Sequence, residues 1–560
     1  MASSAKPRLL LIGIDGADYR ITELLMDRGQ LPNLQALAAR GAWGALRSTV
    51  PPVTPPAWTT LMTGKNPGKH GVFDFLPMDG SDPDIPVAAR RRAVTMWRAL
   101  SQRGYQVGTF NVPCTYPPEP LSGFQVPGFG APRLGSAHVH PPRAFDVLQE
   151  AAEGYDPFPS ASENLEQDAR ARQDRVDLVL AGTDGLLRAF PCDVFMVNFQ
   201  VVDWMQHRAL CAEMAPGDVG SLRIDGEVAG TYRLVDDRVG ALLSEWASPD
   251  THIMVVSDHG GTVADRLVNM EKLLVDAGLL TYALKGSASS SSLDAKRARA
   301  KSAVRVWGAI KRRSPAAARR LAPLARRLRG QVSAYEAEME IDWSRTQAVP
   351  WGFYGQVRFN LQGRDPEGIV LPSAAPALTE KICGLVMSLT DPDSGKLIYQ
   401  EVRSSSDVYR GAFASEGPDL ISLIADDRYM TVCNRMFSWL KMPLIDLQEK
   451  VAVVLDTPTG FHSSVGIMFM AGPSVQHVER LPESNLADIA PTALHLLGEE
   501  VPRDMDGQPV LAALDSAALA ERPVRKCAPW PVDDAVSELA TYTQEERAQV
   551  REYLASLGYL

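Results

Sequence analysis

Short apolar runs that end in polar residues recur along the chain and predict a series of buried strands. The runs occupy Leu9–Ile14, Val107–Phe110, Val194–Phe199, His252–Ser257 and Val465–Met470. Runs of this length, bounded by polar or turn-forming residues, are typical of strands in a parallel sheet that is covered on both faces.

Between the first two runs the apolar residues change to a helical spacing. Leu31, Leu34 and Leu37 recur at this spacing until Gly41, a residue type that commonly stands just beyond the end of a helix. Strands that alternate with helices predict an α/β fold with a mostly parallel central sheet flanked by helices. Ligands of such sheets bind at the carboxyl ends of the strands, so the polar residues after each run become candidate site residues.

The composition of the 560-residue chain is that of a large globular protein. Hydrophobic residues make up 45% and charged residues 22%, so a sizeable buried core is expected. The formal net charge of −10 argues against binding nucleic acid through bulk charge. The six cysteines are scattered without CxxC spacing, which is typical of reduced thiols. No apolar run approaches the length of a membrane span, so we expect a cytoplasmic protein.

One segment departs from this acidic balance. Residues 296–330 hold 13 basic residues and no acidic one, which leaves the rest of the chain at −23. Val304, Trp307 and Ile310 fall at helical spacing, so the segment is expected to form basic amphipathic helices inserted in the fold. Such helices could cover the site and attract phosphate substrates, touch anionic lipid at the membrane periphery, or simply face solvent.

Six aspartates and histidines stand out because most follow a predicted strand or lie one helical turn from another. They are Asp15, Asp203, His207, Asp258, His259 and His462. Asp203 and His207 are four residues apart, so on a helix they share one face and can hold one metal ion. Singly, an Asp-Gly pair is an ordinary turn and a lone histidine an ordinary packing residue, but their joint order favours a metal site. Carboxylates mixed with imidazoles suit Zn²⁺ or Mn²⁺, with Fe as a further option, and the number of ligands suits two ions.

Thr54 is the candidate nucleophile. It precedes Pro55-Pro56, a typical start of a helix, and Gly64 would end that helix. A phosphoryl group at Thr54 would meet the helix N-terminus, where free N–H groups and the dipole favour anions. A metal ion beside the hydroxyl would deprotonate it, whereas without such a partner Thr54 would only cap the helix.

The segments that carry these residues resemble the type I phosphodiesterase/nucleotide pyrophosphatase branch of the alkaline phosphatase superfamily. In chain order they are IGIDG, VTPPAWTTLMTGKNPGKHG, DWMQH, SDHGG and GFHSS, and the resemblance covers most of residues 8–510. The resemblance implies two ligand sets, with Thr54 as the metal-bound nucleophile that forms a covalent phospho-threonine. The sets it implies are Asp203, His207 and His462 for one ion, and Asp15, Asp258 and His259 for the other.

One position departs from the family pattern. Nucleotide pyrophosphatases carry an asparagine a few residues after a His-Gly pair, whereas Phe75 stands near that place here. Asn111, which follows a predicted strand, is our hypothesis for the residue that stabilises the transition state instead.

The resemblance implies a two-metal phosphoester hydrolase that acts on a small-molecule or lipid-linked phosphoester. A phosphonate or phosphomonoester hydrolase and a phosphotransferase are alternatives on the same site. A metal-bound scaffold that binds anions without turnover is a non-enzymatic alternative. Nothing in the sequence indicates the oligomeric state.

The chain is expected to divide into four parts. Residues 1–284 would form the first part of the catalytic core, with the nucleophile and most metal ligands, and residues 285–345 the basic helical insertion or cap. Residues 346–510 would complete the core and cap and carry the last histidine ligand, and residues 511–560 would form a C-terminal tail and helix.

Overall fold

The computed structural model of the chain describes residues 6–75, 86–157, 165–284, 339–432, 451–531 and 542–557. The basic segment 296–330, and with it the expected amphipathic helices, lies outside the described residues. Within the described ranges, none of the helices has both the length and the apolar character that a bilayer span requires.

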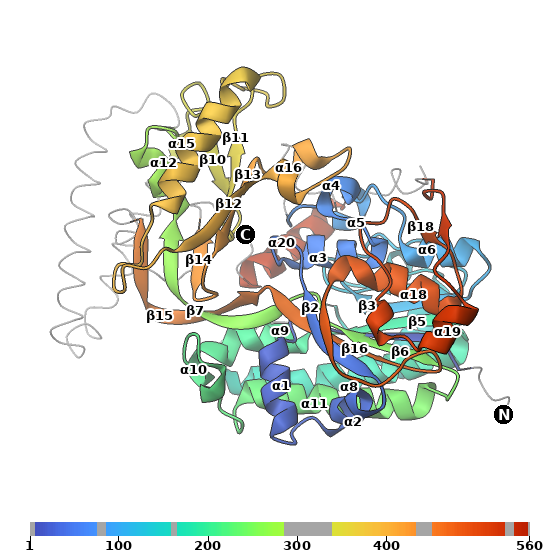
Figure 1. Ribbon diagram of the computed structural model, residues 1–560. Coiled ribbons are helices and arrows are strands. Elements are labelled where there is room, and N and C mark those ends of the chain that lie inside the picture. Colours follow the sequence, from blue (N-terminus) through green and yellow to red (C-terminus); the bar gives the residue numbers. More distant parts are fainter. Residues whose placement is uncertain are drawn as a thin grey trace.

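An eight-stranded sheet forms the centre of the fold (Figure 1). Seven strands run in one direction and β16 runs against its neighbours β2 and β6, so the mostly parallel sheet expected from the sequence is confirmed. Five adjacent strands, β16, β6, β1, β5 and β3, coincide with the five predicted apolar runs. Across the sheet the order is β17 (Val478–Asn485), β2 (Ala42–Arg47), β16 (Val465–Ala471), β6 (His252–Val256), β1 (Leu9–Ile14), β5 (Val194–Phe199), β3 (Val107–Val112) and β4 (Phe124–Pro127).

Helices cover both faces of this sheet, which explains why its strands are continuously apolar. Alternate residues of β1 enter two separate cores: Leu10 and Ile12 pack on one side, and Leu9 and Leu11 on the other. Figure 1 shows α1 (Tyr19–Asp27), α2 (Pro32–Arg40), α8 (Leu165–Ala189) and α11 (Glu227–Trp246) along one face. The opposite face is covered by α3 (Thr54–Thr63), α6 (Met96–Gln102) and α18 (Ile489–Leu497).

A second lobe is inserted between two strands that leave and re-enter the core. The chain leaves along β7 (Gly260–Asn269) and returns along β15 (Ala452–Ser463), and these two strands pair antiparallel. β14 (Tyr429–Val432) pairs parallel with the other edge of β7. Residues 339–432, called the inserted lobe below, include α15 (Ala375–Met387) and an antiparallel sheet. That sheet has the order β10 (Ala348–Trp351), β11 (Gln356–Phe359), β13 (Leu420–Ile424) and β12 (Tyr399–Ser404).

A C-terminal helix, α20 (Gln544–Leu557), packs against the core. The Tyr542 hydroxyl, just before the helix, donates to the Gly130 carbonyl. His138 Nε2 lies 2.9 Å from Glu546 Oε1 on the first turn of the helix. These contacts tie the end of the chain to the loop after β4.

Candidate active site

The three candidate aspartates meet because they follow neighbouring parallel strands. Asp15 follows β1, Asp258 follows β6 by one residue, and Asp203 lies on the short helix α9 (Val201–Met205) that begins after β5. β1 lies between β5 and β6, so the carboxyl ends of all three strands point to the same edge of the sheet. A hydrogen bond from the Asp203 amide to the Asp15 carbonyl, 3.0 Å long, fixes the two loops together.

The histidines reach the same edge by two routes. His207 follows Asp203 by four residues, where α9 continues into a π-helical turn, Gln206–Leu210. His259 immediately precedes β7, and His462 lies near the end of β15, opposite Gly261 in the ladder. The pairing of β7 with β15 therefore brings His259 and His462 together, with ring centroids 3.7 Å apart, although the inserted lobe separates them in sequence.

Six side chains from these four segments form two adjoining groups. In the first, the Nε2 atoms of His207 and His462 lie 3.4 and 3.5 Å from Asp203 Oδ1. In the second, His259 Nε2 lies 3.3 Å from Asp258 Oδ2 and 3.8 Å from Asp15 Oδ1. His259 is also close to Asp203 and His462, so the two groups share an edge. The structure thus assembles both sets of residues that the resemblance implies, and their role as metal ligands stays a prediction.

The hydrogen bonds of the imidazoles favour a cation in this site. Each Nδ1 faces a backbone carbonyl: Gly460 for His207, Pro52 for His462 and Gly260 for His259, at 3.2, 2.9 and 3.0 Å. A carbonyl only accepts, so each Nδ1 carries a proton, and a ring that loses its second proton offers the Nε2 lone pair to a cation. The Nε2 atoms of His207 and His462 are 2.9 Å apart, a contact that is favourable only with a shared proton or a metal ion between them.

Two buried atoms in the second group have no hydrogen-bond partner among the described residues. They are Asp258 Oδ2 and His259 Nε2, an acceptor and a lone pair that face each other at 3.3 Å. Leaving such groups unsatisfied is costly, and a divalent cation bound to both would remove that cost. The residues present therefore fit the metal ions that the family resemblance implies.

The pKa values of the aspartates reflect their crowding. Burial, followed by the charges of Asp258 and Asp203, raises the pKa of Asp15 well above its ordinary value. Burial also raises the pKa of Asp258 to about 6. Burial acts in the same direction on Asp203, but the neighbouring imidazoles, His207 foremost, outweigh it and hold that pKa below its ordinary value. With all three ionised, the site carries excess negative charge that bound cations would neutralise.

Thr54 begins helix α3 beside this cluster. The helix includes Thr54 as its first residue and Val53 is the N-cap, so the start lies one residue earlier than the sequence indicates. Gly64 ends the helix in the left-handed conformation, φ 68°, as predicted. Prolines in the first turn leave fewer N–H groups to satisfy, and their fixed φ suits a helix start.

Contacts on both sides of Thr54 place it against the two groups. Two residues earlier, the Pro52 carbonyl accepts the hydrogen bond from His462. One turn later, Trp58 Nε1 donates to Asp15 Oδ2 at 3.1 Å. Thr54 itself is only 4% exposed, and among the described residues its hydroxyl has no hydrogen-bond partner. Such a hydroxyl at a helix N-terminus is suited to nucleophilic attack once a cation lowers its pKa.

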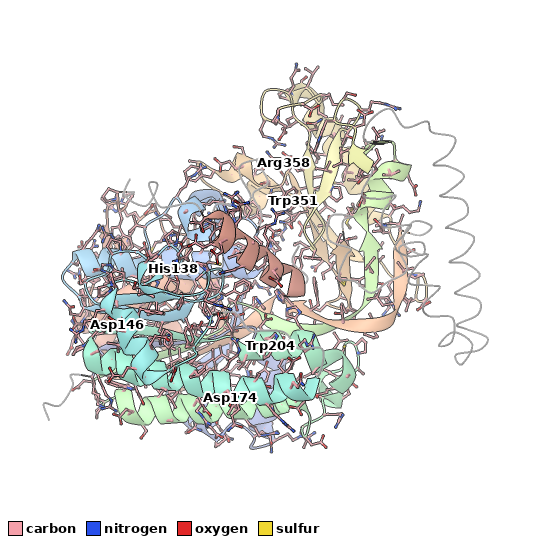
Figure 2. The ribbon with its side chains drawn as sticks, turned by 180° about the vertical axis from the view of Figure 1, so that it is seen from behind. His138, Asp146, Asp174, Trp204, Trp351 and Arg358 are labelled. Carbon is pink, nitrogen blue, oxygen red and sulfur yellow. The ribbon has the colours of Figure 1, made fainter. Side chains whose placement is uncertain are left out.

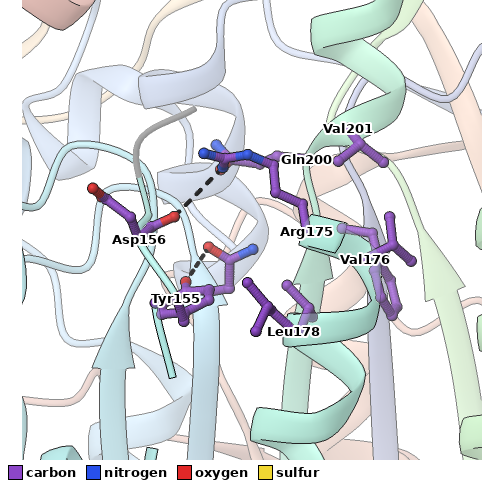
Figure 3. Close-up of a pocket in the computed structure, with 11 residues that line it drawn as sticks. Tyr155, Asp156, Arg175, Val176, Leu178, Gln200 and Val201 are labelled. Carbon is purple, nitrogen blue, oxygen red and sulfur yellow. Dashed lines mark hydrogen bonds between the residues drawn. The ribbon is translucent and has the colours of Figure 1, made fainter. Parts of the chain in front are cut away.

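Asn111 lies at the end of β3, near the site but already engaged. Its amide nitrogen donates to the Asn198 carbonyl at 2.8 Å, and its amide oxygen accepts from the Tyr155 hydroxyl at 2.7 Å. Asn111 also lines a small cavity between the loop at Tyr155 and the helix that carries Arg175 (Figure 3). One N–H of Asn111 stays available, so its assignment to the transition state stays a prediction.

Trp58 is a site residue that the sequence analysis missed. It is fully buried and its indole N–H holds Asp15. The signal was present, because Trp58 lies four residues after Thr54 on a predicted helix and therefore on the same face. His70 ends the next short helix, α4 (Pro67–His70), and its Nε2 lies 3.0 Å from the Thr60 hydroxyl, which ties α4 to α3.

One of two comparisons with known proteins finds a match. A family model described as type I phosphodiesterase / nucleotide pyrophosphatase matches residues 9–351, more than half of the chain. The matched stretch contains every candidate residue except His462, which β15 brings back from the far side of the inserted lobe. A comparison with curated proteins finds no match.

Proposed function

Because the chain belongs to the type I phosphodiesterase/nucleotide pyrophosphatase family, a branch of the alkaline phosphatase superfamily, we propose that it hydrolyses phosphodiesters at the Asp/His cluster beside Thr54. The observation that carries the proposal is the convergence of three imidazole Nε2 atoms and three carboxylates at one edge of the sheet. Hydrogen bonds from His462 to the Pro52 carbonyl and from Trp58 to Asp15 join this cluster to the segment that carries Thr54. An anion-binding scaffold would need neither an unpartnered hydroxyl nor an activating cluster at that point.

Two divalent ions complete the proposed site, with Asp203, His207 and His462 as one ligand set. Asp15, Asp258 and His259 form the other. Ions held there would supply Lewis acidity that lowers the pKa of the Thr54 hydroxyl and offsets charge on the leaving oxygen. Zn²⁺ suits the mixed nitrogen and oxygen donors best, with Mn²⁺ or Fe as alternatives.

The residues of the chain define two chemical steps. Thr54 Oγ1 attacks phosphorus, and as the new O–P bond forms, the bond from phosphorus to one ester oxygen breaks and an alcohol leaves. The other ester group stays on the resulting phospho-threonine. Water then attacks the same phosphorus, the bond to Thr54 Oγ1 breaks, and a phosphomonoester is released. The N-terminus of α3 stabilises the anionic phosphoryl group throughout.

Trp58 and the three backbone carbonyls orient the side chains that are proposed as metal ligands. The indole N–H holds one oxygen of Asp15, so the other is directed toward His259. The carbonyls of Gly460, Pro52 and Gly260 fix the orientation and tautomer of the imidazoles. Such contacts keep the ligands in place before substrate arrives and thereby reduce reorganisation during the reaction.

The test compares three variants of α3 on bis(p-nitrophenyl) phosphate in metal-loaded protein. Thr54→Ala should lower kcat/KM on the order of 1,000-fold or more, and Thr54→Ser should keep part of the activity because it retains the hydroxyl. Thr59→Ala is the matched control, since it removes a buried hydroxyl of the same helix that has no partner among the described residues. Wild-type rates in Thr54→Ala, in correctly folded protein, would contradict the proposal.

A substrate panel defines the preferred ester. We propose a small-molecule or lipid-linked phosphodiester as the substrate, acted on in the cytoplasm, with peripheral membrane contact through residues 296–330. Rates on diester, monoester and phosphonate substrates should rank the diester first. A higher kcat/KM on the monoester or the phosphonate would assign the same site to those reactions instead.

A further inference from the structure

The C-terminal helix α20 is held on the core by polar contacts at its first turns. The backbone N–H groups of Thr543 and Glu546 each donate to the side chain of the other residue, which fixes the start of the helix. Glu546 also contacts His138, and Gln549 Oε1 accepts from the Arg133 amide at 3.2 Å. Figure 2 shows the helix running from the region of His138 toward the inserted lobe, so α20 lies between the core and the lobe.

The apolar side of α20 belongs to a cluster that reaches the catalytic residues. Val550 shares this hydrophobic cluster with Val53, which immediately precedes Thr54, and with Phe461, which immediately precedes His462. The Phe461 ring lies 6.0 Å from the imidazole of His462. One cluster therefore joins the C-terminal helix to the candidate nucleophile and to a candidate metal ligand.

Paired aromatic rings make up most of this cluster, called the aromatic cluster below. The pairs bring together the core, the inserted lobe and the C-terminal segment, and they are Tyr116 with Tyr542, Phe75 with Phe129, and Tyr354 with Phe461. Within each pair the ring centroids are 5.0 to 5.7 Å apart. Phe75 is the residue that departs from the family pattern, so a polar position is replaced here by part of an apolar surface.

The rings of the aromatic cluster do not close completely on one another. Each of the six keeps 5% to 8% of its surface exposed, whereas Leu9 and Leu11 in the core beside the sheet have 0%. Residual exposure on every ring indicates a narrow crevice that water reaches. Its walls are uncharged, and the Tyr542 hydroxyl is bound to the Gly130 carbonyl. Water in such a crevice finds few hydrogen bonds, so an apolar group that displaces it gains free energy.

We propose that this crevice receives an apolar ester group of the phosphodiester and that α20 forms one of its walls. The inference rests on the proposed function and names the substrate class of the same site, a diester with an uncharged alkyl or aryl group. In an in-line attack the leaving oxygen lies opposite Thr54 Oγ1. The crevice begins at Val53, the neighbour of Thr54, so we assign it to the ester group that stays on phosphorus.

Two diesters with the same leaving group isolate this contact. Methyl p-nitrophenyl phosphate and butyl p-nitrophenyl phosphate both release p-nitrophenolate, and they differ only by three methylene groups on the retained ester. Burial of one methylene strengthens binding about fourfold. Metal-loaded wild-type protein should therefore prefer the butyl ester by about 10-fold or more in kcat/KM.

Two variants change the wall that α20 contributes. Val550→Asp places a charge in the aromatic cluster, and Tyr542→Ala removes one of its rings. Both should lower the butyl-to-methyl ratio of kcat/KM toward unity. Glu545→Ala is the matched control, because it changes an exposed position of the same helix and should keep the wild-type ratio. Thermal unfolding and metal content, measured for all three, establish that each variant is folded and loaded.

A ratio near unity in the wild type, or the wild-type ratio in both Val550→Asp and Tyr542→Ala, would overturn the inference. Hydrolysis that depends on Thr54 but shows no preference for the butyl ester would leave the hydrolase in place and remove the subsite.

Failure of the proposed function is distinguished by a binding measurement. If the wild type hydrolyses no diester, the Kd values of methylphosphonate and butylphosphonate, from isothermal titration calorimetry, decide the subsite alone. Binding of butylphosphonate about 10-fold tighter, with the difference lost in Val550→Asp, supports the subsite. Equal Kd values for the two phosphonates in the wild type would remove it.

Discussion

Replacing Asp258 with asparagine should stabilise the metal-free protein. Asp258 is fully buried beside two other carboxylates, and burial raises its pKa to about 6 from the ordinary 3.8. A difference of about two pKa units corresponds to a cost on the order of 3 kcal/mol for ionising Asp258 in the folded protein. An asparagine at this position avoids that cost at every pH.

The local contacts allow the amide to fit. Asp258 Oδ1 accepts from the Gly16 amide at 3.2 Å, and an asparagine oxygen can keep this bond. The asparagine NH₂ group would replace Oδ2, which lies 3.3 Å from His259 Nε2. Since the Gly260 carbonyl fixes the His259 proton on Nδ1, the amide can donate to the Nε2 lone pair. The substitution thus replaces Oδ2, which has no hydrogen-bond partner, and gives His259 Nε2 a donor.

The sign of the pH dependence follows from proton binding. With its pKa raised, Asp258 binds a proton more tightly in the folded than in the unfolded state, so its contribution to stability is present at low pH. That contribution is lost as the pH rises from about 4 to about 6. The advantage of Asp258→Asn should therefore be absent near pH 4 and approach its full value, about 3 kcal/mol, at pH 8.

Urea unfolding in EDTA at pH 4 and pH 8 measures this difference. Asp265→Asn is the control, because Asp265 is paired with Arg428 at 2.7 Å and its neutralisation should destabilise the protein at pH 8. Added Zn²⁺ should reverse the order of wild type and Asp258→Asn, since only the intact site gains the free energy of metal binding. A variant less stable than wild type at pH 8 in EDTA would refute the reasoning.

Two further substitutions test the ligand assignment. His207→Ala removes a nitrogen from the group around Asp203 but leaves the group around Asp15 intact. The metal content after dialysis should therefore fall from two equivalents per chain toward one. An unchanged metal content would show that His207 is no ligand. Trp58→Phe removes the N–H that holds Asp15 and should weaken zinc binding about 10-fold in a competition titration. An unchanged zinc affinity would mean that Asp15 is oriented without the Trp58 hydrogen bond.

The strands were predictable because each is buried on both faces and ends abruptly in polar residues. Two of the five runs, Leu9–Ile14 and Val194–Phe199, have the same bounds in the structure. An apolar run carries no direction, however, so the reversed course of β16 between β2 and β6 could not be inferred. Direction is set by the connections, which run through the inserted lobe.

The candidate residues were predictable as a set but not as a geometry. Position after a strand identified Asp15 and Asp258, and helical spacing joined Asp203 to His207. The contact of His259 with His462 depends on the pairing of β7 with β15, for which the sequence holds no local signal.

Acid quenching during turnover of bis(p-nitrophenyl) phosphate, followed by peptide mass spectrometry, tests the central claim most directly. Our account predicts a p-nitrophenyl phosphoryl group on Thr54, formed as the first p-nitrophenolate leaves and lost as water attacks. An adduct on another residue, or product formation with no adduct at any quench time, would contradict it.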